Sequence, residues 1–282
     1  MKKITTYLLF ENDEEIIQSI ATLSSTDKIL NFQVFDKSIL STETHFAYDE
    51  KEHLIEKTEE ITTGGTTTIR YKFDEKDEVI ATQTYYGADL YEEQKLEYLE
   101  DKSIKTTFQD GKIIEKIIES EKEDGSEELL VYDENDKLLQ KQVTIAYENA
   151  TEITISDGDG KLVGLSVEFF DENDELKEKK EYDENKNLIR IDRYTTENGL
   201  VTQHYIKTKV DNEVLELNNL YQYDENENEI AKEVNMPNGQ SLVLESKKYN
   251  SNNEIIEEIY ENLSGNMGYG TSYHKIYKIE EV

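Results

Sequence analysis

The chain has no cysteine and no tryptophan, and its 282 residues include a single proline. Without cysteine there is no disulfide, no thiolate nucleophile and no cysteine-based zinc site. Scarce proline suits a protein with many inner strands, because each strand residue needs its backbone N–H for the ladder. The one exception, Pro237, lies in a predicted turn, Pro237-Asn238-Gly239.

Long apolar runs are also missing. No stretch approaches the ~20 apolar residues that a membrane-spanning helix needs. The short apolar run near the start is interrupted by Thr5 and Thr6, ends at Phe10 and is followed at once by acids. A secretory signal needs about 7–15 apolar residues and a small-residue cleavage site. We therefore expect a cytoplasmic protein without membrane contact.

Basic residues are few relative to acidic ones: 31 Lys and Arg stand against 64 Asp and Glu, which leaves a net charge of −33. Such a surface repels nucleic acid and anionic lipid, and it attracts basic partners. Alternatively, the charge serves only to keep the protein soluble. A repetitive sheet with exposed edge strands needs charge to prevent edge-to-edge association.

Apolar residues make up only 35% of the chain, whereas globular domains usually contain about 45–50%. Together with the mean hydropathy of −0.78, this composition would by default indicate disorder. However, the chain contains 19 Tyr and 8 Phe, and aromatic residues favour strands. A thin sheet with a narrow apolar face accounts for both observations.

A short repeat organises the sequence: an aromatic residue, then Asp-Glu-Asn or a variant, then two polar and two aliphatic residues. Its clearest copies begin at Tyr48, Phe73, Tyr132, Phe170, Tyr182 and Tyr223, and looser copies begin at Phe10, Tyr98 and Tyr249. We interpret the aromatic residue as the end of one strand, the acidic-amide cluster as a turn and the aliphatic pair as the start of the next strand. The left-handed residue of the turn is expected at 135–136 in one copy and at 185–187 in another.

The spacing of the copies predicts stacked hairpins. Tyr48, Phe73 and Tyr98 are 25 residues apart, whereas Phe170, Tyr182 and Tyr194 are 12 apart. One strand plus one turn therefore takes about 12 residues, and the longer period is a complete hairpin. We predict an all-β protein, an elongated and twisted antiparallel meander of repeated hairpins with little helix.

Three segments are expected along the chain. Residues 1–47 form an irregular N-terminal cap within the same sheet, residues 48–261 form the hairpin repeat region, and residues 262–282 form a Gly/Tyr-rich capping segment. Within the first segment, residues 14–23 fit either a short amphipathic helix or a strand. We favour the strand, because residues 10–17 match the repeat.

The aromatic-Asp-Glu-Asn-x-x-aliphatic pattern resembles the YD-type repeat of rearrangement-hotspot (Rhs) proteins. More loosely, it is similar to the MORN-type hairpin repeats of bacterial antitoxin-like proteins. The likeness extends from Tyr48 to Tyr260, but this chain is too short for an Rhs shell and has Asp, Lys or Asn where those turns carry Gly. The resemblance implies a hairpin-repeat fold and an association with toxin–immunity systems. It implies no catalytic residue.

Residues that could carry chemistry form no recognisable constellation. Asp157-Gly158-Asp159-Gly160 lacks the ligand spacing of a calcium loop, so a plain turn is expected there. His45 and His53 flank the Tyr48 turn, but a metal site there would need further ligands, and an exposed pair is the simpler interpretation. No nucleophile elbow, phosphate-binding loop or basic nucleic-acid surface occurs. We expect no enzyme activity, no metal and no cofactor.

The leading hypothesis is a non-catalytic cytoplasmic immunity protein or antitoxin. It would neutralise a basic toxin, such as a nuclease domain, by occluding its active site or by mimicking its anionic substrate. The alternative is a structural or surface-exposed β-repeat protein that acts as a spacer or adhesive. Acids supply steering and tyrosines supply contact area, although cross-strand packing explains most tyrosines equally well. The candidate partner-binding residues are Asp133, Glu134, Asp171, Glu172, Asp183, Glu184, Asp224, Glu225, Tyr269, Tyr273 and Tyr277.

Overall fold

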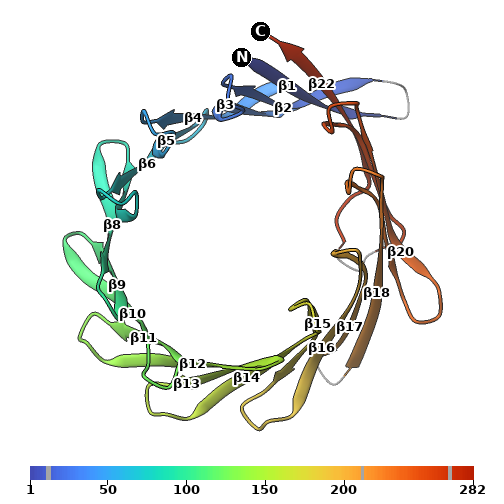
Figure 1. Cartoon of the computed structure of the whole chain (residues 1–282). Coiled ribbons are helices and arrows are strands. Elements are labelled where there is room, and N and C mark those ends of the chain that lie inside the picture. Colours follow the sequence, from blue (N-terminus) through green and yellow to red (C-terminus); the bar gives the residue numbers. More distant parts are fainter. Residues whose placement is uncertain (11–13, 211–212, 266–268) are drawn as a thin grey trace. The chain divides into compact units, whose positions relative to one another are not determined.

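The computed structural model describes residues 1–10, 14–210, 213–265 and 269–282, which form strands and turns with no helix among them. Successive strands pair antiparallel, so the predicted all-β hairpin meander is confirmed (Figure 1). The strands are β1 (Lys2–Leu9), β2 (Glu15–Leu23), β3 (Ile29–Asp36), β4 (Ile39–Tyr48), β5 (Leu54–Ile61), β6 (Thr66–Phe73), β7 (Val79–Tyr86), β8 (Asp89–Tyr98), β9 (Lys102–Gln109), β10 (Lys112–Glu121), β11 (Glu127–Asp133), β12 (Leu138–Tyr147), β13 (Ala150–Asp157), β14 (Leu162–Phe170), β15 (Leu176–Tyr182), β16 (Leu188–Glu197), β17 (Leu200–Val210), β18 (Glu213–Tyr223), β19 (Glu229–Asn235), β20 (Ser241–Tyr249), β21 (Ile255–Asn262) and β22 (Tyr273–Glu281).

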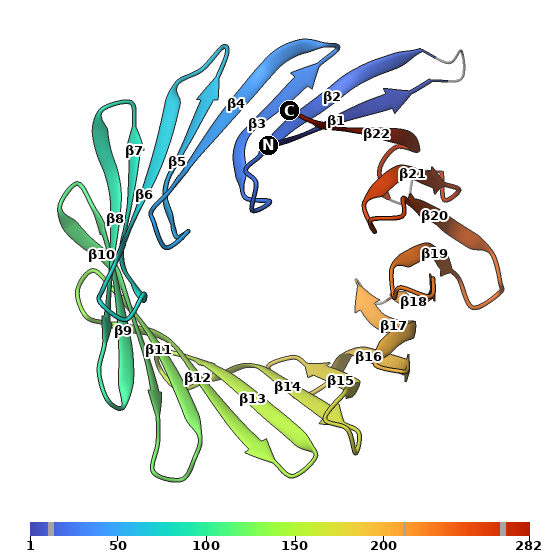
Figure 2. The ribbon, with the colours of Figure 1, turned by 45° about the horizontal axis from the view of Figure 1, so that its top comes forward.

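The chain divides into two compact units, residues 1–117 with 274–282 and residues 118–273. In the first unit, β1 pairs antiparallel with both β2 and β22, so that Ile4 lies opposite Ala21 on one side and Ile279 on the other. The following strands continue as hairpins, which Figure 2 traces from β3 to β9. The boundary between the units falls within β10, inside the predicted repeat region, and the predicted N-terminal segment contains β1 to β4.

In the second unit, β11 to β20 each pair antiparallel with the next strand along the chain, and the series ends at β21. Bulges interrupt the register where a repeat copy begins, for example between Glu181 and Tyr182. A bulge inserts one extra residue and increases the local twist. The position of the aromatic residue at the end of a strand, predicted from the repeat, is confirmed for Tyr132, Tyr182 and Tyr223.

The sheet has little apolar core. Among the described residues, Ala81, Val234, Leu242 and Val243 are the buried apolar side chains, and only the last three form a cluster. Stability must therefore come largely from backbone ladders and cross-strand side-chain pairs. This agrees with the narrow apolar face that the composition indicates.

Two local predictions concern the N-terminal half. Residues 15–23 form the strand β2, which confirms the strand interpretation over the helix. The turn of the predicted Phe10 repeat copy includes residues 11–13, which lie outside the described residues. The described part of the chain contains no helix long and apolar enough to cross a membrane.

Candidate binding surface

One five-residue turn recurs along the chain. In the copy at Asp183, the Asp183 amide donates to the carbonyl of Asn187 at 3.0 Å, and the Lys186 amide donates back to the Asp183 carbonyl at 2.9 Å. The fourth residue of the turn is left-handed, with φ of 62° at Lys186. This is a type I turn followed by a left-handed bulge residue. The other copies begin at Ser24, Asp49, Asp74, Lys122, Asp133, Asp157, Asp171, Asp224, Met236 and Asn250.

The structure identifies which residue of each predicted window is left-handed. It falls on Asp136 in the Asp133 turn, with φ of 58°, and on Lys186 in the Asp183 turn. Asn187 is not left-handed; its side chain instead donates from Nδ2 to Asp183 Oδ2 at 3.0 Å. The Asn187 end of the predicted window is therefore wrong, because the turn geometry fixes the fourth residue whatever its type.

The aspartate that opens each turn stabilises the turn itself. Asp183 Oδ1 accepts hydrogen bonds from the amides of Asn185 at 2.9 Å and Asn187 at 2.8 Å. These bonds satisfy backbone donors that would otherwise depend on water. The same pair of bonds occurs at Asp133, Asp171 and Asp224. These four candidate residues thus have a structural role.

Hydrogen bonding also favours the ionised form of two of these carboxylates, Asp183 and Asp224. The Asn187 side chain, with the backbone amides of Asn187 and Asn185, holds the pKa of Asp183 below its usual value. The Asn228 side chain has the same effect on the pKa of Asp224. A hydrogen bond donated to the charged form of an acid favours that form. Asp183 and Asp224 consequently keep their negative charge at neutral pH.

The glutamates that follow these aspartates are different. Glu134, Glu172, Glu184 and Glu225 are all exposed, whereas the aspartates before them are half-buried. Glu134 and Glu184 each accept a side-chain bond from the neighbouring Asn of their own turn. The eight predicted acids therefore separate into four that build turns and four that present charge to solvent.

In the second unit these turns lie at the two opposite ends of the strands, which we call its two edges. The Asp133 turn joins β11 to β12 and the Asp183 turn joins β15 to β16, so both lie on one edge. The Asp171 turn joins β14 to β15 and the Asp224 turn joins β18 to β19, on the opposite edge. Glu134 and Glu184 share one row, and Glu172 and Glu225 share the other.

The candidate tyrosines are engaged in packing. Tyr269 packs against the cluster of Val234, Leu242 and Val243, and its carbonyl accepts a hydrogen bond from the Tyr260 hydroxyl. The Tyr273 ring stacks on Tyr260 with centroids 5.1 Å apart. These contacts hold the start of the C-terminal segment against the apolar cluster.

Tyr273 and Tyr277 both lie on β22. The Tyr273 hydroxyl donates to Glu258 Oε1 at 2.6 Å, and burial, followed by this bond, raises the pKa of Tyr273. Tyr277 lies on β22 in the first unit, where it pairs with Thr6 of β1. Tyr269 and Tyr273 are thus brought together by their contacts with Tyr260, and Tyr277 lies four residues after Tyr273 on the same strand.

A buried charge cluster in the second unit was not predicted. Asp192 on β16 accepts bonds from Arg190 Nε at 2.6 Å and Nη2 at 2.8 Å. His204 Nε2 on β17 lies 2.7 Å from Asp192 Oδ1, and its ring stacks on Tyr194 at 4.4 Å. The alternation Arg190-x-Asp192-x-Tyr194 places these side chains on one face, but only the register of β17 brings His204 to them. The cluster is fully paired, and this favours a structural role.

A second unpredicted feature recurs in both units: a cation held between a carboxylate and an aromatic ring. In the first unit, Arg70 Nε lies 2.7 Å from Glu56, and its guanidinium lies over Tyr85 at 5.0 Å. In the second unit, Arg193 binds Glu178 at 2.7 Å and lies over Tyr205 at 5.9 Å. Each arrangement combines an ion pair with a cation–π contact. We call it a carboxylate–cation–aromatic triad.

The histidines that flank the Tyr48 turn have separate partners. His45 Nδ1 lies 3.2 Å from Asn31 Nδ2. His53 Nδ1 lies 3.0 Å from Asp49 Oδ2, and its ring stacks on Phe73. Within the described ranges, no group of three or more His, Cys, Asp or Glu is placed to hold a metal ion. Asp157 bonds the amides of Asp159 and Lys161, as the other turn aspartates do.

No protein family and no curated protein matches the chain. Solved structures that match include TcdB2-TccC3, with 12% identity, a TM-score of 0.31 and coverage of 90% of this chain and 16% of that one. A porin-like protein from Bacteroides uniformis ATCC 8492 has 12% identity, a TM-score of 0.32 and coverage of 99% and 97%. A porin-like protein from Bacteroides vulgatus ATCC 8482 has 15% identity, a TM-score of 0.29 and coverage of 68% and 96%. The chain thus spans about a sixth of the length of TcdB2-TccC3, and its similarity to these proteins is a loose likeness of fold.

Proposed function

We propose that the protein is a non-catalytic binding protein that captures a basic protein partner on the acidic turns of its second unit. One observation carries the proposal: Glu134, Glu172, Glu184 and Glu225 are exposed, while the aspartate before each of them already completes the turn. The glutamates are thus available for a partner, and they recur at equivalent positions of the repeat.

The net charge of −33 supports the same proposal through kinetics. Exposed charges on two facing surfaces act mainly on the rate of encounter, because they attract an oppositely charged partner before contact. Their effect is screened over ~10 Å at 0.1 M salt. Capture should therefore be fast at low salt and slow markedly as salt rises.

The partner that we propose is a toxin with a basic surface, such as a nuclease domain, which the protein neutralises in the cytoplasm as an immunity protein or antitoxin. Binding covers the active site, or the row of carboxylates takes the place of an anionic substrate. The resemblance of the repeat to those of toxin–immunity systems supports this class of partner. Nucleic acid and anionic membranes are repelled by the same charge.

The test begins with affinity capture from the native cell and continues with association kinetics on the captured partner. Three double variants each remove two charges: Glu134→Gln with Glu184→Gln, Glu172→Gln with Glu225→Gln, and Glu50→Gln with Glu75→Gln. The last pair is the matched control, because Glu50 and Glu75 are exposed and follow a turn aspartate in the first unit.

We expect at least one of the second-unit pairs to slow association several-fold more than the control pair does, with little change in dissociation. If all three double variants slowed association equally, the attraction would come from the net charge of the whole chain. The proposed role of the second-unit turns would then be overturned. An association rate independent of salt would refute steering altogether.

A further inference from the structure

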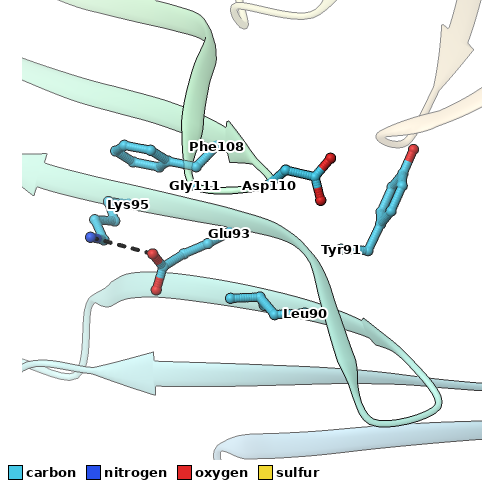
Figure 3. A pocket seen from close by; sticks show the side chains of 7 residues that line it. All are labelled: Leu90, Tyr91, Glu93, Lys95, Phe108, Asp110 and Gly111. Atoms are coloured by element: carbon cyan, nitrogen blue, oxygen red, sulfur yellow. Dashed lines mark ion pairs between the residues drawn. The ribbon is translucent and has the colours of Figure 1, made fainter.

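The first unit contains a triad that lies inside a pocket. The pocket has a volume of about 240 Å³ and lies between β8 and the turn that joins β9 to β10 (Figure 3). At one end, Lys95 Nζ lies 3.3 Å from Glu93 Oε2 and 4.9 Å from the centroid of the Phe108 ring. Glu93 also accepts a bond from Gln83 at 2.7 Å, so this end is filled by the chain's own groups.

The other end of the pocket has a carboxylate and an aromatic ring, as a triad has, but no cation between them. Tyr91 supplies an aromatic ring and Asp110 supplies a carboxylate, which extends toward the side on which Tyr91 lies (Figure 3). Lys95 is the only cation among the described residues that line the pocket, and it is held by Glu93. Leu90 lines the pocket beside Tyr91, and both are exposed, by 44% and 41%.

A further exposed aromatic side chain lies beside Tyr91 at this open end. Tyr86 lies against Tyr91 with ring centroids 4.9 Å apart and is itself 55% exposed. Ile113 and Ile114, both exposed, follow the Asp110-Gly111 turn in the sequence. Exposed aromatic and aliphatic side chains beside a charged group, here Tyr86, Tyr91 and Leu90 with Asp110, are typical of a contact surface.

We propose that this pocket receives an arginine or lysine side chain of a protein partner, with its aliphatic stem on Leu90 and its charged head between the Tyr91 ring and the Asp110 carboxylate. The bound side chain completes a triad of the kind that Arg70 and Arg193 form within the chain. Charge complementarity selects a cation, because Asp110 is the pocket carboxylate that Lys95 does not hold.

This inference rests on the proposed function, since it names an anchor for the same basic partner. Steering by the exposed glutamates acts before contact, whereas a cation between a ring and a carboxylate holds the partner after contact. The pocket should consequently influence the dissociation rate, and the glutamates should influence the association rate.

The test uses Nα-acetyl-arginine amide as the probe and the full chain with labelled leucine and isoleucine methyl groups. The methyl signals of Leu90, Ile113 and Ile114 are followed by nuclear magnetic resonance during titration. We expect saturable shifts of the Leu90 signal with a dissociation constant on the order of millimolar, as for a single weak contact. Nα-acetyl-citrulline amide, which has a similar shape and no charge, should bind at least about tenfold more weakly.

Two variants assign the site. Asp110→Asn should weaken binding of the arginine probe to the level of the citrulline probe. The turn should survive, because Asn198-Gly199 forms the corresponding two-residue turn with φ of 54° and 80°, close to the 51° and 72° of Asp110-Gly111. Glu134→Gln, which removes one charge in the second unit, should leave the titration unchanged.

The absence of shifts at Leu90, equal binding of the two probes or full binding by Asp110→Asn would each overturn the pocket proposal. None of these results would affect salt-dependent capture of a basic protein by the glutamates. Conversely, selective probe binding at Leu90 together with salt-independent capture would leave the pocket in place and remove the proposed function.

Discussion

Asp192 and His204 meet across β16 and β17, with His204 Nε2 2.7 Å from Asp192 Oδ1. Arg190 binds the same carboxylate from its own strand. The Asp192 side chain is only 3% exposed, in a sheet that buries few residues. Burial raises the pKa of Asp192, but the bonds from Arg190 and His204 outweigh it and bring the pKa below its usual value. The two donors thus keep a buried acid ionised.

The first prediction is that Asp192→Asn lowers the free energy of unfolding by about 1–3 kcal/mol at pH 7, because Arg190 loses a charged acceptor. A carboxylate with a depressed pKa stabilises the fold above its unfolded pKa of about 3.9, and this contribution is lost as pH falls through the folded value. The deficit of the variant should therefore shrink below about pH 4. Urea denaturation at pH 7 and pH 3 measures both values.

Asp159→Asn is the matched control, because Asp159 is exposed in a turn and its substitution removes the same charge. We expect it to change stability little at either pH. A deficit for Asp192→Asn that is equal at pH 7 and pH 3 would contradict the role assigned to the ionised carboxylate.

The second prediction concerns Gly158, where a Cβ atom would lie 1.9 Å from the carbonyl oxygen of Leu138. Backbone cannot yield as a flexible side chain does, so Gly158→Ala should cost about 2 kcal/mol or more. At Gly164 the nearest atom, the Tyr182 carbonyl oxygen, would be 3.6 Å from the added Cβ, an ordinary contact. Gly164→Ala should be tolerated, and thermal unfolding of the two variants compares them directly.

The third prediction distinguishes neighbouring residues of one turn. Lys186→Gly should raise the free energy of unfolding by up to ~1 kcal/mol, because Lys186 is left-handed and Gly has no Cβ penalty there. Asn187→Gly should instead lower it, because the bond from Nδ2 to Asp183 is lost and the unfolded chain gains freedom. The denaturant midpoints of the two variants measure this difference. If Asn187→Gly were the more stable variant, the left-handed residue of the turn would be assigned wrongly.

The fourth prediction tests the turn acceptor. Asp171→Ala should lower stability by about 1 kcal/mol, because the amides of Asn173 and Glu175 lose their acceptor. Asp171→Asn should be nearly neutral, since Asn250 opens an equivalent turn and its Oδ1 accepts from Asn252 and Glu254. Comparable losses for Ala and Asn would show that charge, rather than the acceptor, stabilises the turn.

The turns were predictable because their information is local: an aspartate, its following amides and the next strand lie within a few residues. Even so, the left-handed residue was placed only within a window at 185–187, because residue type is a weak guide when Lys186 occupies a position that Gly prefers. Side-chain contacts between neighbouring strands could not be predicted from the sequence. The contact between Asp192 and His204 depends on the register of β16 and β17, and the position of Lys95 over Phe108 depends on the register of β8 and β9. A shift of register by one residue would turn these side chains to the other face.

The antiparallel pairing of consecutive strands also limits how such a chain can change in length. In the first unit, each strand from β4 to β9 runs antiparallel to the one before it. Removing a single strand would leave its two former neighbours parallel, and parallel strands need a long crossover connection instead of a tight turn. Removing a whole hairpin of 25 residues, such as the interval from Tyr48 to Phe73, would preserve the alternation. Viable length variants should therefore differ by whole hairpins.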